Sequence, residues 1–282
     1  FSTQVSKNAS KKLYDALDFT GYFKLIDHKA FIDDPTKRGM VAKEINFSNW
    51  TGIGAELLII GGVKVNGDKV VMELKLFDTL KERMLVGKKY KGSIEDLRKI
   101  IHRFCGEVMF QLIGNRGIFG SKIAFVLANS GLKEIYICDF DGRDLKQFTN
   151  YNSISITPAW SSDGKWLAFT TFKEGKPDIF IKHLEKNRWA QIAKKGINIS
   201  PAWVPGQFKL SASLSFSGDS EIYLLTGMGK IIKKLTIRRG IDVSPSWSPD
   251  GKKFAFVSRR SGSPQIYICN YQSGKIERLT YN

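Results

Sequence analysis

Histidine and cysteine are scarce in this sequence, with three of each among 282 residues, and this limits the chemistry available to the chain. Cys105, Cys138 and Cys269 lie too far apart for a Cys-x-x-Cys metal or redox motif. Neither His28 nor His102 has an acidic residue or a cysteine at ligand spacing, so we expect both to be structural. The Gly-x-Ser-x-Gly motif of serine hydrolases is absent. We therefore expect no enzyme activity, no metal site and no cofactor.

The sequence also lacks an apolar run long enough to span a bilayer, since the longest extends only from Leu57 to Gly62. Residue 1 is Phe, and no signal-peptide pattern precedes it, so we expect any signal peptide to have been removed. With 42% hydrophobic and 25% charged residues, the composition is that of an ordinary folded protein. The sequence therefore favours globular structure over disorder.

Acidic residues are few relative to basic ones, 27 against 44, and the formal net charge is +17. Basic pairs such as Lys194-Lys195 and Arg259-Arg260 recur along the chain instead of forming one tract. No RNA-binding, zinc-finger or helix-turn-helix signature accompanies them. We interpret the charge as a solvated basic surface that favours an acidic partner, and a basic nucleic-acid-associated scaffold is the alternative.

The first 116 residues predict a small α+β domain. Apolar residues recur with a helical period from Val5 to Leu17, and Gly21 ends this predicted helix. Three further segments are expected before the sheet, namely a short strand, a polar loop and one helical turn, at Tyr22–Ile26, residues 33–39 and Phe47–Ile53.

A three-stranded meander and a long helix complete this predicted domain. Asn66-Gly67 lies between two apolar runs and predicts a hairpin, because both central positions of such a turn favour positive φ. A third strand is expected near Met84–Tyr90. From Ser93 to Leu112 the apolar residues form a single stripe, and Ser93 with Asp96 resembles a capping box. This helix is expected to pack on the open face of the sheet.

A repeat dominates the remainder, residues 117–282. Its clearest copy is Ser-Pro-Ser-Trp-Ser-Pro-Asp-Gly at residues 244–251, and related segments begin at Thr157 and Ser200. Their tryptophans, Trp160, Trp203 and Trp247, lie 43 and 44 residues apart. A period in the low forties is typical of a β-propeller, in which each unit forms one blade of four antiparallel strands.

The strands of this repeat do not occur equally often. The second, third and fourth strands occur four times, but the Pro-x-Trp strand occurs three times, because the first unit begins directly at Lys122–Val126. An open ring would leave exposed sheet edges, so we expect a truncated propeller whose other blades and closing strand are absent. Cys138 and Cys269 occupy the same place in two distant units, so we expect no disulfide between them.

These motifs resemble the TolB family. The resemblance rests on the Ser-Pro-x-Trp-Ser-Pro-Asp-Gly repeat, on the preceding α+β domain, on Ala55–Gly62 and on Ser121–Val126. It implies a six-bladed propeller, here incomplete, in a periplasmic component of the Tol-Pal system of Gram-negative bacteria, which serves outer-membrane integrity and cell division. It also implies a non-catalytic monomer that reaches membranes only through its partners. The family's segment before the first helix is expected to be absent.

The resemblance further implies two protein partners. The peptidoglycan-associated lipoprotein Pal binds over one mouth of the propeller, and TolA contacts the N-terminal region. Residues just before and within the start of the Pro-x-Trp strands are expected to face Pal, because loops at one mouth form a concave surface. The candidates are Ser155, Thr157, Ile197, Asn198, Ser200, Asp242, Val243 and Ser244. The alternative is that these residues only shape the turn before proline.

Two other interpretations remain. A related propeller occurs in some peptidases, so the chain could be the propeller domain of a peptidase-like hydrolase, although a separate hydrolase domain would then be required. Asp139-x-Asp141-Gly142-x-Asp144 could bind a metal, but it lacks the length and the final Glu of an EF-hand loop. We interpret it as an Asp-Gly hairpin turn.

Overall fold

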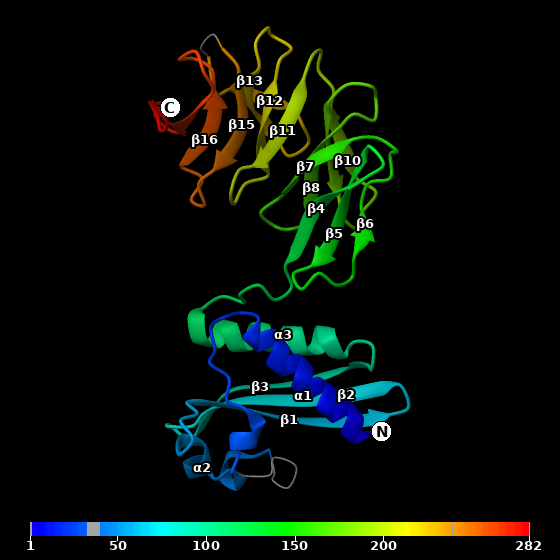
Figure 1. Ribbon diagram of the computed structural model, residues 1–282, viewed down its shortest axis with the longest axis vertical. Helices are drawn as coiled ribbons and strands as arrows, with labels where there is room; N and C mark the ends of the chain where they lie inside the picture. Colours follow the sequence, from blue (N-terminus) through cyan, green and yellow to red (C-terminus); the bar gives the residue numbers. More distant parts are fainter. Residues whose placement is uncertain (1, 33–39, 238–239, 282) are drawn as a thin grey trace. The chain divides into compact units, whose positions relative to one another are not determined.

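The computed structural model describes residues 2–32, 40–237 and 240–281, and the loop predicted at residues 33–39 lies outside them. The chain divides into two compact units, Phe1–Ser121 and Lys122–Asn282 (Figure 1). The first unit is an α+β domain and the second consists of antiparallel sheets, which confirms the predicted fold class. No helix in the described ranges is long and apolar enough to cross a membrane.

The first unit is built on one antiparallel sheet of order β1-β2-β3, formed by β1 (Leu57–Asn66), β2 (Lys69–Asp78) and β3 (Arg83–Ser93). The predicted hairpin joins β1 to β2, and Gly67 adopts φ 58° in its turn. Such a positive φ is readily accessible to glycine because it has no Cβ. The predicted meander is therefore confirmed.

Two helices, α1 (Ser2–Asp18) and α3 (Leu97–Ile113), lie on one side of this sheet (Figure 1). Alternate residues of β2 point to them, and Met72 there is fully buried, as is Phe104 of α3. A short helix, α2 (Phe47–Thr51), covers one end of the opposite side, where Phe47 packs against Phe77 with ring centroids 6.0 Å apart. Two 3-10 turns, η1 (His28–Ala30) and η2 (Ala42–Glu44), complete the unit.

Two predictions for the first unit are wrong. Tyr22–Ile26 does not form a strand. Instead, the half-buried Phe23, Leu25 and Ile26 line a groove beside β1, and these side-chain contacts do not require the hydrogen bonds of a strand. The long helix begins at Leu97, not at Ser93. Ser93 and Asp96 do exchange the hydrogen bonds of a capping box, with Ser93 N–H donating to Asp96 Oδ2 at 2.9 Å, but they close a separate turn before the helix.

The second unit contains four sheets, which we call blades 1 to 4 in chain order. Blade 1 has three strands and blades 2 to 4 have four each. The strands of blades 1 and 2 are β4 (Lys122–Asn129), β5 (Leu132–Asp139), β6 (Lys146–Gln147), β7 (Ser155–Trp160), β8 (Trp166–Thr171), β9 (Asp178–His183) and β10 (Trp189–Ile192). Those of blades 3 and 4 are β11 (Asn198–Trp203), β12 (Lys209–Leu214), β13 (Glu221–Thr226), β14 (Ile231–Lys234), β15 (Asp242–Trp247), β16 (Lys253–Ser258), β17 (Gln265–Asn270) and β18 (Ile276–Arg278). As predicted, blade 1 lacks the Pro-x-Trp strand.

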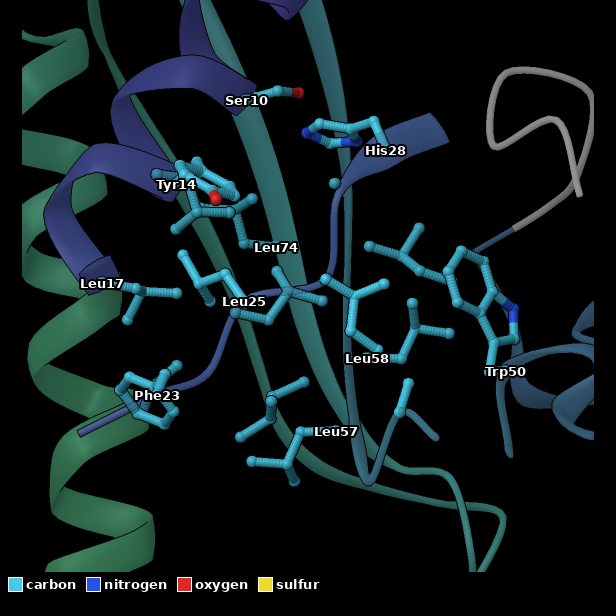
Figure 2. A pocket seen from close by; sticks show the side chains of 18 of the residues that line it. Ser10, Tyr14, Leu17, Phe23, Leu25, His28, Trp50, Leu57, Leu58 and Leu74 are labelled. Carbon is cyan, nitrogen blue, oxygen red and sulfur yellow. The ribbon is translucent and has the colours of Figure 1, made fainter. Parts of the chain in front are cut away.

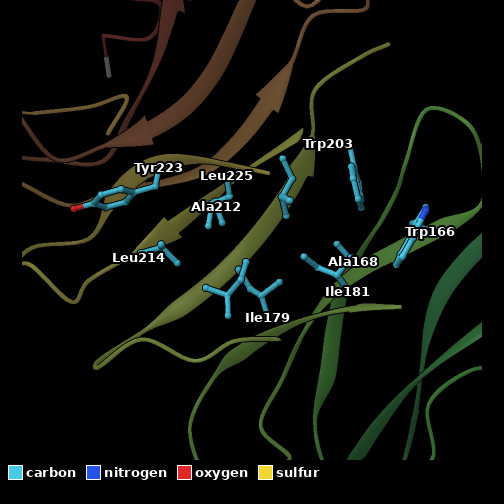
Figure 3. Packing of buried hydrophobic residues seen from close by; sticks show 11 residues of the cluster. Trp166, Ala168, Ile179, Ile181, Trp203, Ala212, Leu214, Tyr223 and Leu225 are labelled. Carbon is cyan, nitrogen blue, oxygen red and sulfur yellow. The ribbon is translucent and has the colours of Figure 1, made fainter. Parts of the chain in front are cut away.

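Neighbouring blades pack face to face through apolar side chains. Between blades 2 and 3, Ile179 and Ile181 of β9 and Ala168 of β8 meet side chains of β11 to β13, including Leu214 (Figure 3). The Trp203 indole Nε1–H also donates to the Ala159 carbonyl oxygen of the preceding blade at 3.1 Å. Trp247 Nε1–H likewise donates to Ser211 Oγ of the preceding blade at 2.9 Å, so both tryptophans join consecutive blades by a hydrogen bond as well as by packing.

A second repeated contact lies inside the blades. In blade 3, Thr236 Oγ1 donates to Glu221 Oε2 at 2.7 Å and accepts from Ile222 N–H at 3.0 Å. Blade 4 repeats the pattern with Thr280 and Gln265. Blade 1 also has it, with Thr149 and Glu134. This threonine fastens the segment after the fourth strand to the start of the third.

The three cysteines are buried free thiols, consistent with the prediction that no disulfide joins Cys138 to Cys269. Burial raises the pKa of Cys105 to about 12 and also raises the pKa of Cys269. A thiol with a raised pKa is a poor nucleophile at neutral pH. Cys105 and Cys269 therefore serve as packing groups.

Candidate partner-binding surface

The first strands of blades 2 to 4 form the inner row of the second unit. Strand β11 contacts both β7 and β15, so the three Pro-x-Trp strands follow one another in space (Figure 1). Each strand begins with a polar residue, Ser155, Asn198 or Asp242. The eight predicted site residues therefore gather at or beside the same end of this inner row.

A bulge interrupts each inner strand at the residue before proline. The pairing register shifts after Ile156, Ile199 and Val243. The residues that follow have left-handed φ values of 51°, 55° and 57°, at Thr157, Ser200 and Ser244 respectively. Such a conformation is strained for a residue with a side chain and persists only where its surroundings fix it.

Buried hydroxyl groups of the preceding blade help to fix these bulges. Ser200 N–H donates to Thr170 Oγ1 at 3.2 Å, and Ser244 N–H donates to Ser213 Oγ at the same distance. Thr170 also shares a 2.8 Å hydrogen bond with the Thr157 hydroxyl. The second strand of one blade thus positions the inner strand of the next.

Three of the predicted site residues are buried. Ser155 and Asn198 have no exposed surface, and Asp242 is only 1% exposed. Ser155 Oγ donates to Thr171 Oγ1 at 3.0 Å, and Asn198 Nδ2 donates to Asp178 Oδ1 at 2.9 Å. Their side chains therefore hold the sheets together and do not form an accessible surface.

Asp242 forms a buried ion pair with Arg260, whose Nη2 lies 2.8 Å from Asp242 Oδ2. The same guanidinium lies over the rings of Phe256 and Tyr267, 5.0 and 4.9 Å from their centroids, and Arg260 Nε–H donates to Ser258 Oγ at 2.8 Å. A buried charge requires such compensation. This arrangement makes Asp242 a structural residue of blade 4.

The other predicted site residues are more accessible. Ile197 is 44% exposed, Thr157 and Ser244 are exposed, and Ser200 and Val243 are half-buried. Ile241, which was not among the predicted residues, is 41% exposed and precedes β15 just as Ile197 precedes β11. The signal was available, because both isoleucines stand immediately before the first residue of a Pro-x-Trp strand.

The Asp139 segment forms the predicted hairpin turn. Gly142 N–H donates to the Asp139 carbonyl oxygen at 2.9 Å, and Gly142 adopts φ 79°. The Asp139 carboxylate pairs with Lys122 at 2.8 Å, and Asp141 Oδ1 accepts from Arg143 N–H at 3.2 Å. Within the described ranges, His, Cys, Asp and Glu side chains do not cluster as a metal site would require.

A second surface feature is an apolar groove of about 1450 Å³ in the first unit. It is lined by α1, β1 and the segment that was wrongly predicted as a strand. Figure 2 shows Leu17, Phe23 and Leu25 gathered opposite Leu57 of β1. Strand β1 is an edge strand, so one side of its backbone has no neighbouring strand in the described sheet.

The fold and the inner-strand geometry define a β-propeller protein with an α+β domain before its blades. Comparisons with known proteins place it more narrowly: residues 110–282 match the TolB beta propeller domain and residues 2–85 match the TolB amino-terminal domain. The chain belongs to the TolB family.

Similar proteins carry the same family name. The chain is 54% identical to the Tol-Pal system protein TolB of Desulfosudis oleivorans and 41% identical to a TolB homolog of Chlorobium chlorochromatii. Each alignment covers 83% of this chain and 53% of the relative, so the chain spans about half the length of the curated relatives it matches. It also resembles the crystal structure of TolB from Acinetobacter baumannii, with 27% identity, a TM-score of 0.79 and coverage of 97% of this chain and 68% of that one.

Proposed function

We propose that the chain is part of a non-catalytic, periplasmic component of the Tol-Pal system that acts by binding other proteins. Its partner at the propeller is a Pal-type lipoprotein, and its partner at the N-terminal unit is a TolA-type inner-membrane protein. The protein is a monomer that serves outer-membrane integrity and cell division, and it reaches membranes only through these partners. Membership of the TolB family is the observation that supports this proposal most strongly.

The Pal-type partner binds at the inner-strand ends of blades 2 to 4. The exposure of Ile197 and Ile241 at equivalent positions supports this assignment, because an exposed apolar side chain that recurs with the repeat is a candidate anchor for a partner. The exposed Thr157 and Ser244 add polar groups near them, and the half-buried Val243 and Ser200 add smaller contacts. The buried side chains of Ser155, Asn198 and Asp242 stabilise the strands that carry this surface through the hydrogen bonds described above.

A pull-down with the Pal homologue tests this assignment. The variant Ile197→Arg with Ile241→Arg is expected to lose most of the binding, because each substitution places a charge where an apolar contact is proposed. The matched control is Ile232→Arg with Leu279→Arg. Ile232 lies in the outer strand β14 and Leu279 directly follows the outer strand β18; they are 45% and 55% exposed and should tolerate the change. Undiminished binding by the first variant contradicts the site, and no binding by the parent protein contradicts the function.

The TolA-type partner is assigned to the N-terminal unit, where the apolar groove offers a contact surface. Ser10 is exposed on α1 and lines this groove, whereas Asn8 is exposed on the same helix and does not line it. In a pull-down with the TolA homologue, Ser10→Arg is expected to weaken binding and Asn8→Arg to leave it unchanged. Equal binding by both variants contradicts the groove as the contact surface.

A further inference from the structure

The side of the β1-β2-β3 sheet that faces away from α1 and α3 is strongly basic. Alternate residues of each strand point to one side of a sheet, and the pairing register shows which ones lie together. Val71 pairs with Lys64 on β1 and with Lys91 on β3. In the next row, Glu73 pairs with Gly62 and Lys89. This surface, which we call the lysine face, contains Lys64, Lys69, Lys75, Lys89 and Lys91.

Among the residues that the structure describes, few acidic groups balance the charge of the lysine face. Its strand residues include five lysines and a single acid, Glu73, which pairs with Lys75 at 3.0 Å. Lys75, followed by Lys89 and Lys64, holds the pKa of Glu73 below its usual value. In the part of the chain that the structure describes, no ion pair joins Lys64, Lys69, Lys89 or Lys91 to a carboxylate, and all four are exposed.

The two ends of the lysine face differ. At one end, α2 covers Phe77, Met40 lies against Gly62, and Lys75 Nζ donates to the Met40 carbonyl oxygen at 3.1 Å. The other end, with Lys64, Lys69 and Lys91, lies beyond the row of Gly62, Glu73 and Lys89 in the pairing register. Like charges on neighbouring positions of a sheet repel one another, so this arrangement does not stabilise the unit. It instead creates a positive electrostatic potential that attracts an anionic partner.

We propose that the lysine face docks an extended acidic polypeptide in which alternate residues are Asp or Glu. Lys89 and Lys91 are alternate residues of β3, and alternate side chains of an extended strand are separated by about 6.8 Å. An acidic peptide in the same conformation presents its carboxylates at the same spacing. The rows beside these lysines contain Val71, Asn66 and Ser93 but no large exposed apolar side chain suited to insertion into a lipid bilayer.

Binding of labelled peptides to the full chain at low ionic strength tests this proposal. An alternating Glu-Ser peptide is expected to bind in a salt-dependent manner, and a peptide of equal composition with consecutive glutamates is expected to bind several-fold more weakly. Lys64→Glu with Lys91→Glu reverses both charges beside Val71 and should weaken the alternating peptide about tenfold, since exposed charge contacts are individually modest. Lys64→Arg with Lys91→Arg should retain binding.

The control is Lys7→Glu with Lys11→Glu, which changes the net charge equally on exposed positions of α1. Equal weakening in both glutamate variants would show a response to overall charge and overturn the lysine face as the site. Equal affinity for the two peptides would overturn the alternating spacing. Binding to anionic phosphatidylglycerol vesicles without binding to either peptide would identify a lipid surface and refute a polypeptide partner.

Discussion

The repeated threonine contact allows a graded test of what holds a blade together. Thr236 is fully buried, and its hydroxyl bonds the Ile222 N–H and the nearly buried Glu221 carboxylate. Thr236→Val keeps the shape but leaves that N–H unpaired and removes one hydrogen bond from a buried charge. Each loss costs roughly 1–3 kcal/mol. Because the surrounding structure relaxes in part, we expect Thr236→Val to lower the free energy of unfolding by about 2–4 kcal/mol in total.

Thr280→Val is the matched control in blade 4. Thr280 makes equivalent bonds to the Ile266 N–H and to Gln265, but it is only half-buried and its acceptor is neutral. We therefore expect Thr280→Val to lower the free energy of unfolding by only about 1 kcal/mol. Water can reach the Ile266 N–H more readily, since Ile266 is 40% exposed.

Urea unfolding followed by tryptophan fluorescence measures both variants, because five of the six tryptophans lie in the second unit. Amide hydrogen exchange adds a local measurement, in which Thr236→Val should reduce the protection of the Ile222 N–H. Equal destabilisation by the two variants, or unchanged protection of Ile222, would refute the importance assigned to the buried carboxylate contact.

Three other predictions follow from the electrostatics of the structure. The Ser161 hydroxyl, followed by the Lys165 N–H, lowers the pKa of Asp163 below 3.8. Wild type should therefore be more stable than Asp163→Asn near neutral pH, and this advantage should disappear as the pH falls below about 3.8. Thermal unfolding of both proteins across this pH range measures the difference. Arg260→Met leaves the Asp242 carboxylate buried without its partner, so it should lower the free energy of unfolding in urea by about 3–5 kcal/mol. A decrease below about 1 kcal/mol would contradict this role of the ion pair. Cys105 should resist alkylation by iodoacetamide at pH 8 until the protein unfolds, because burial raises its pKa to about 12, and rapid labelling of the folded protein would contradict its packing role.

Most of the second unit could be predicted from its period. The Pro-x-Trp motif, the Asp-Gly turns and the apolar third strand are local patterns, and repetition reinforces each of them. The missing inner strand of blade 1 was therefore visible in the sequence. By contrast, Tyr22–Ile26 looks like a strand locally, yet its environment depends on how α1 and β1 pack, and a single non-repeated segment contains no information about that packing.

The burial of Asn198 and Asp242 also could not be predicted from the sequence, because it depends on contacts with residues distant in the chain. Asn198 looks like an exposed turn residue, but its amide bonds Asp178, which lies in the preceding blade. Asp242 looks like a free acid before a turn, but Arg260 reaches it from beyond β16 in the same blade. Asp178 has acidic counterparts in blades 1 and 3, Glu134 and Glu221, but those carboxylates accept from threonines of their own blades. Alignment of the repeats therefore could not reveal that Asp178 instead bonds Asn198.

Two neighbouring positions at the start of each inner strand distinguish the residues that support the proposed surface from those that contact the partner. Within each inner-strand start, a buried polar residue directly follows an isoleucine that is exposed in blades 3 and 4. If stability alone governed these positions, the apolar residue would be expected inside and the polar one outside. The reversed order at Ile197-Asn198 and at Ile241-Asp242 places the polar groups where they join strands and leaves the apolar groups accessible. We therefore infer that Ile197 and Ile241 are the residues of this surface that contact the partner.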